Sequence, residues 1–225
     1  MLSISIQKTV RFLFFITIII SILGLLRNIF EYVLMFDYGT ELLDVFNLNE
    51  EQNIPAWYSS VILLLCGIII YLISLYKKSL KDKYHSHWFW LSIIFCYLSL
   101  DESISIHEDF KLRFLFNKNH ILYNDSWVIA FSILVGIFIF TYRRFLQNLP
   151  QKTRKMFIIS GCIYICGSAG LEIVGSFTQE FYGKASMIHA LIVTAEEFLE
   201  MIGIVVFINT LLAYVESEID TISFK

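Results

Sequence analysis

The sequence is dominated by long apolar runs, which restrict the possible folds more than any other feature. The hydrocarbon core of a bilayer is about 30 Å thick, so a helix needs about 20 mostly apolar residues to cross it. Six runs approach this length: 12–36, 57–76, 88–108, 127–142, 156–176 and 187–214. The pattern predicts an all-α fold, a polytopic membrane helical bundle of about six transmembrane helices.

Composition excludes most other classes of protein. Apolar residues make up 57% of the 225 positions and charged residues 16%, against about 45–50% and 25% in soluble globular chains. The net charge is −3, and a nucleic-acid partner would require clustered Lys and Arg on one face. We therefore expect one transmembrane domain over residues 1–225, membrane lipid as its partner and no nucleic acid. No oligomeric state is predicted.

The distribution of Lys and Arg predicts the orientation of the chain. The two terminal segments and the loops after the second and fourth runs hold 12 of them, and the other loops hold 4. Because short cytoplasmic loops are enriched in Lys and Arg, both termini are predicted to be cytoplasmic, in a multi-pass protein of the plasma (bacterial inner) membrane. In the acidic first outer loop, residues 41–46 are expected to form a short surface helix.

Ionisable side chains occur inside these runs. Each costs at least about 2.5–3.5 kcal/mol at the bilayer centre, so such residues usually have a function. They are Arg27, Glu31, Asp101, Glu102, His107, Glu108, Glu172, His189, Glu196, Glu197 and Glu200. At a rise of about 1.5 Å per residue, they fall in the middle and outer parts of the bilayer. We therefore expect one shared polar site there.

Helical phase, at about 100° per residue, predicts which of these side chains share a face. In the last run, His189, Glu196 and Glu200 form one stripe, with Glu197 to its side. In the fifth run, Glu172 shares a face with small residues such as Gly161. Small residues mark close contacts between membrane helices, so Glu172 is expected to point into the bundle.

The third run has its own predicted stripe. Asp101 and Glu108 share a face, and Glu102 flanks it. His107 lies well round the helix and is expected to face a different neighbour.

Charge limits the state of the predicted site. The third, fifth and sixth runs contribute seven carboxylates, against a single arginine, Arg27. They cannot all be ionised and unpaired at low dielectric, so some are protonated, or cations lie among them, or water enters. Arg27 can pair with Glu31 one turn away, or it can serve as the counter-ion of the shared site.

Carboxylates combined with imidazole suit a divalent metal ion such as Zn, Fe or Mn. The sequence therefore predicts a metal site and a separate set of acid–base groups. The expected metal ligands are His107, Glu108, Glu172, His189, Glu196 and Glu200. The expected catalytic residues are Asp101, Glu102 and Glu197.

We favour a metal-dependent intramembrane enzyme, a hydrolase or oxidoreductase, acting on a lipid or lipid-linked substrate in the outer half of the bilayer. The first alternative is a cation or proton transporter or channel. Against it, the inner half lacks a polar path and no run shows a broken helix. The second alternative is a structural or sensing subunit whose polar network only fixes helix packing.

Overall fold

The computed structural model describes residues 5–50, 53–110, 112, 120–121 and 126–218. Every regular element in these ranges is helical, in agreement with the predicted all-α class. The elements are α1 (Ile6–Tyr32), α2 (Asp37–Leu43), the 3-10 helix η1 (Asp44–Phe46), α3 (Ile54–Ser79), α4 (His85–Ile104), α5 (Ile106–Asp109), α6 (Trp127–Asn148), α7 (Gln151–Ile165), the π-helix η2 (Cys166–Leu171), α8 (Glu172–Tyr182) and α9 (Met187–Glu218).

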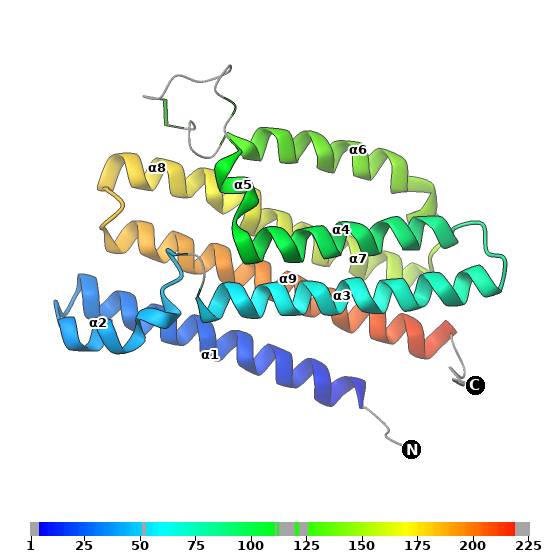
Figure 1. Ribbon diagram of the computed structural model, residues 1–225, viewed down its shortest axis with the longest axis horizontal. Coiled ribbons are helices and arrows are strands. Elements are labelled where there is room, and N and C mark those ends of the chain that lie inside the picture. Colours follow the sequence, from blue (N-terminus) through cyan, green and yellow to red (C-terminus); the bar gives the residue numbers. More distant parts are fainter. Residues whose placement is uncertain (1–4, 51–52, 111, 113–119, 122–125, 219–225) are drawn as a thin grey trace.

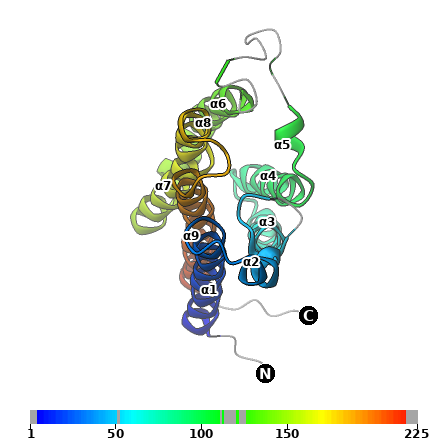
Figure 2. The same cartoon turned by 90° about the vertical axis from the view of Figure 1, so that its left-hand side faces the viewer.

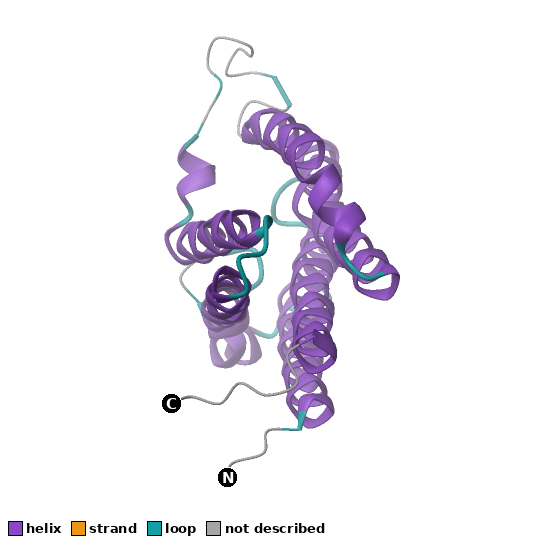
Figure 3. Cartoon of the chain, turned by 90° about the vertical axis from the view of Figure 1, so that its right-hand side faces the viewer, coloured by secondary structure: helices purple, strands orange, loops and turns teal. Residues whose placement is uncertain are grey.

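The long helices lie along the long axis of the molecule and run alternately in opposite directions between its two ends (Figure 1). α1 begins and α9 ends at one end, where the α3–α4 and α6–α7 turns also lie; we call it the terminal end. α2 and the α8–α9 turn lie at the opposite end, and α5 lies between the two ends, beside the start of α6. End-on views show two layers, one with α1, α9 and α7, the other with α3 and α4, while α6 lies at the edge near α8 (Figures 2 and 3). α9 is central, because it packs against α1, α3 and α7.

Five helices among the described residues are long and apolar enough to span a membrane. They are α1, α3, α6, α9 and the continuous segment Gln151–Tyr182, which comprises α7, η2 and α8. The sequence predicted about six spans. The difference is α4, whose 20 residues carry polar side chains at both ends.

Two of the predicted spans are not regular α-helices. α4 ends at Ile104, because Ser105 adopts a left-handed conformation with φ of +54°. The fifth run contains the π-helix η2, which shifts the helical phase along it. The expectation of unbroken helices was therefore wrong in the third run, whereas the fifth run stays one continuous helix. Residues 41–46 are helical as predicted, although α2 already begins at Asp37.

Close packing of α9 against α7 and η2 depends on two glycines. A Cβ atom on Gly203 would lie 2.9 Å from the backbone nitrogen of Tyr164. One on Gly167 would lie 2.9 Å from the carbonyl oxygen of Glu196. A Cβ on Gly161 would have nothing within 4 Å, so its predicted place in a close helix contact was wrong.

Aromatic side chains fill the core towards the terminal end. Trp88 of α4 and Phe145 of α6 are each 1% exposed. The Trp88 ring stacks on Tyr214 of α9 at a centroid distance of 5.2 Å. Phe95 stacks on Phe207 at 4.9 Å. This apolar packing joins α4, α6 and α9 near the terminal end. The predicted site residues lie nearer the opposite end.

Candidate functional site

The break after α4 brings His107 back onto Asp101. The backbone N–H of His107 donates to Oδ1 of Asp101 at 2.9 Å. Its ring Nδ1 lies 2.9 Å from Oδ2 of the same carboxylate. The prediction that His107 faces a different neighbour was wrong, because it assumed that the helix continues through Ser105.

A cavity of about 250 Å³ lies against this pair, between α4, α5, α6, α7, η2 and α9. Its ionisable lining residues are Asp101, Glu102, His107, Glu197 and Glu200. Its other lining residues are Tyr97, Leu98, Ile106, Phe110, Trp127, Ala130, Phe131, Leu134, Tyr164 and Ser168. The cavity therefore has both a carboxylate-rich part and an apolar, aromatic part.

Two aromatic residues that the sequence analysis did not select help to form the site. The ring of Trp127, at the start of α6, lies 4.6 Å from that of His107 by centroid. Tyr164 of α7 lies in the electrostatic environment of several cavity carboxylates, which are Glu200, Glu102, Asp101 and Glu197. Tyr164 precedes Ser168, another cavity residue, by four positions in the sequence. Helical periodicity could therefore have placed the two side chains on the same face.

Glu172 and Glu196 form a separate carboxyl pair. The side chain of Glu196 hydrogen-bonds to Glu172 and also lies near Glu200 and Glu197. Glu196 is 8% exposed. A carboxyl group can donate to another carboxyl group only in its protonated form. Glu172 points into the bundle, as predicted, but neither member of the pair lines the cavity.

The remaining predicted site residues lie elsewhere. His189 is buried, and its Nδ1 lies 3.1 Å from Oγ1 of Thr178 in α8. It does not line the cavity. The side chain of Glu108 lies outside the described part of the chain.

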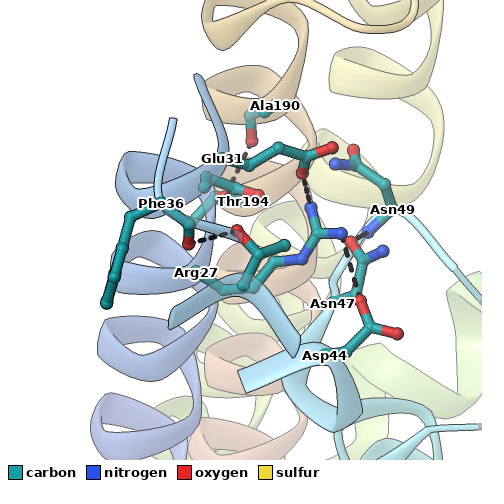
Figure 4. A network of polar contacts seen from close by, with 10 residues as sticks. Arg27, Glu31, Phe36, Asp44, Asn47, Asn49, Ala190 and Thr194 are labelled. Carbon is teal, nitrogen blue, oxygen red and sulfur yellow. Dashed lines mark hydrogen bonds and ion pairs between the residues drawn. The ribbon is translucent and has the colours of Figure 1, made fainter. Parts of the chain in front are cut away.

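Arg27 belongs to a second polar network, which joins α1, η1 and α9 (Figure 4). It forms an ion pair with Glu31, one turn away on α1. A second ion pair joins it to Oδ1 of Asp44 in η1 at 3.1 Å. The neighbouring Asn28 donates to Oγ1 of Thr194 in α9 at 3.2 Å. Of the two alternatives for Arg27, the structure contains the pairing with Glu31.

The predicted metal ligands do not form one group. Within the described ranges, no three His, Cys, Asp or Glu side chains are close enough together to hold a metal ion. His107 and Glu200 line the cavity, whereas Glu172 and Glu196 pair with each other and His189 contacts Thr178. The predicted divalent metal therefore has no support from the described residues.

The model of one protein family, described as a domain of unknown function (DUF8692), matches residues 13–215. The chain belongs to the DUF8692 family. All cavity-lining residues of this DUF8692 chain fall inside the matched range. Neither a curated protein nor a solved structure matches it significantly.

The Asp101–His107 pair gives this DUF8692 chain an acid–base group on the cavity wall. A carboxylate that accepts from Nδ1–H fixes the imidazole tautomer in which Nε2 takes up a proton. The same carboxylate stabilises the imidazolium ion that forms. The arrangement can therefore accept a proton from a molecule in the cavity and later return it.

Proposed function

We propose that this DUF8692 chain is an intramembrane hydrolase that acts on a lipid or lipid-linked substrate. One observation carries the proposal: His107, bound to Asp101 through Nδ1, lies on the wall of a cavity that combines carboxyl groups with apolar and aromatic side chains. An apolar pocket with a few convergent polar groups is the usual form of a small-molecule site. A substrate with an alkyl chain fits such a lining.

In the proposed reaction, His107 takes a proton from water as the water oxygen attacks a carbonyl carbon of the substrate. The bond from that carbon to the leaving group then breaks, and the imidazolium ion returns its proton to the leaving group. The developing oxyanion needs hydrogen-bond donors. Among the described lining residues, donors include the hydroxyl of Tyr164, the indole N–H of Trp127 and any protonated carboxyl group of Glu102, Glu197 or Glu200.

We also propose that α4 crosses the membrane beside the five apolar helices, which makes six spans. Lys and Arg are concentrated at the terminal end, on and beside the turns that join α3 to α4 and α6 to α7. By the positive-inside rule the terminal end is cytoplasmic, and the cavity lies in the outer half of the plasma membrane.

The test is reconstitution of the purified chain into liposomes of mixed lipid classes, followed by mass spectrometry of the lipids. We expect wild type to convert one lipid class, and Asp101→Asn to lower the rate by about 10²–10⁴-fold. An amide at position 101 can donate towards Nδ1 and stabilise the wrong tautomer. Glu196→Gln is also expected to abolish the activity, because Glu196 adjoins Glu200 and Glu197.

Thermal melting of the same proteins distinguishes a loss of catalysis from a loss of folding. We expect both variants to fold. Glu196→Gln should melt at or above the wild-type temperature, because it removes a carboxyl group from a crowded acidic region. Asp101→Asn should melt slightly lower, because it loses the carboxylate contact with His107. Glu50→Gln, at an exposed position, is the control. Misfolding of both variants with a normal control would favour the structural or sensing subunit. Elemental analysis of these preparations tests the divalent metal, which stays a sequence-based prediction.

A further inference from the structure

Aromatic rings form much of the cavity lining. The described lining residues include five aromatic rings besides the imidazole. They belong to Tyr97, Phe110, Trp127, Phe131 and Tyr164. Aromatic rings attract cations through the negative charge of their faces, and cages of such rings recognise quaternary ammonium groups.

The charges of the cavity also favour a cation. Four carboxyl groups line it, and none of its described lining residues is Lys or Arg. Arg27, the one arginine inside the predicted spans, is paired with Glu31 and Asp44. An anionic head group would be repelled here, whereas a cation would permit more of the carboxyl groups to ionise.

The cavity also offers a route for an aliphatic chain. Leu98, Ile106 and Leu134 contribute apolar lining. Leu134 of α6 is 63% exposed, and Ile137 and Ile133 on the same helix are also exposed. An alkyl chain can therefore leave the cavity along the apolar surface of α6 while its head group stays among the carboxylates.

From these three features we propose that the cavity binds the positively charged head of a single-chain amphiphile, an alkylammonium or alkyl quaternary ammonium group. Glu197 and Glu200 supply the negative charge, and Trp127 and Tyr97 supply the ring faces. The inference rests on the proposed function, since it assigns the substrate class of the same site.

The experiment compares two probes of equal chain length on the purified full chain in dodecyl maltoside micelles. Dodecyltrimethylammonium carries the cationic head, and dodecyl phosphate is the anionic counterpart. We expect a saturable rise in melting temperature with dodecyltrimethylammonium, at least about tenfold weaker binding of dodecyl phosphate, and a change in Trp127 fluorescence that is lost in Trp127→Phe. Equal binding of the two probes would overturn the inference.

Variants test the two contributions separately. Glu197→Gln with Glu200→Gln should weaken binding of dodecyltrimethylammonium at least about tenfold, whereas the exposed control Glu50→Gln should leave it unchanged. If the double variant does not fold, Tyr97→Leu serves instead, because Tyr97 is 53% exposed. We expect it to bind about fivefold more weakly, from loss of a cation–π contact. Unchanged binding in the folded variants would overturn the inference.

The two proposals fail in different ways. Saturable binding of the ammonium probe without turnover of any lipid supports the cationic site and removes the hydrolase. Turnover of a neutral or anionic lipid, with no binding of the ammonium probe, supports the hydrolase and overturns the cationic site.

Discussion

Arg27 shows how a charged residue inside an apolar helix can have a structural role. Its side chain is 8% exposed, and its two carboxylate partners come from α1 and η1. The ion pairs fasten the segment after α1 onto that helix (Figure 4). The buried Asn28 then joins α1 to α9 through Thr194.

We expect Arg27→Met to lower the stability of the protein by on the order of 1 to 3 kcal/mol, because Glu31 and Asp44 lose their cation. Both carboxylates are partly exposed, so water compensates for some of the loss. Thermal melting in detergent is the measurement, with Arg11→Met at an exposed position of α1 as the matched control. Equal melting of the two variants would mean that Arg27 does not hold this segment.

At the scale of the elements, the contact between α7 and α9 depends on the absence of a side chain at Gly203. The atoms that a Cβ would meet are the backbone nitrogen and Cα of Tyr164, at 2.9 and 3.1 Å. Backbone atoms cannot turn aside as the end of a flexible side chain can. α7 and α9 would have to move apart at Tyr164, which lines the cavity.

Gly203→Ala is therefore expected to destabilise the protein by about 1–3 kcal/mol, the usual effect of overpacking. Gly161→Ala is the matched control, because it lies in α7 and its Cβ would have nothing within 4 Å. It should be neutral or stabilising by up to about 1 kcal/mol, since alanine favours helix more than glycine does. Thermal melting compares the two, and the reverse order would contradict the close contact.

At the scale of the whole molecule, the two ends differ in charge and in content. Lys and Arg gather at the terminal end, and aromatic packing fills the adjoining core. The cavity and the carboxyl pair lie towards the opposite end. A membrane protein with this asymmetry should have one orientation.

We expect single cysteines at Lys83 and Lys152 to be protected from a membrane-impermeant thiol reagent in intact cells, and one at Glu50 to be labelled. All three positions are exposed, whereas the nearby Asn47 is 3% exposed and unsuitable. The exposed Cys96, Cys162 and Cys166 are first replaced by alanine, and the buried Cys66 is kept. The opposite labelling pattern would reverse the orientation and place the cavity in the cytoplasmic half.

The sequence by itself determined the helical class, the approximate positions of the long helices and the half of the molecule that holds the ionisable residues. These are local properties, because the length of an apolar run and the rise per residue do not depend on the neighbouring helices. The inward direction of Glu172 was also predicted, although Gly161, which was expected to share its face, makes no close contact.

Only the tertiary structure decided which of these residues meet. The left-handed Ser105 ends α4 and returns His107 to Asp101, and the π-helix shifts the phase of the fifth run, so a regular helical wheel misplaces side chains beyond each point. The predicted stripe of Glu196 and Glu200 divides between a carboxyl pair and a cavity, because two different helices approach α9 there. Such contacts depend on backbone irregularities and on packing between distant segments, which helical periodicity does not encode.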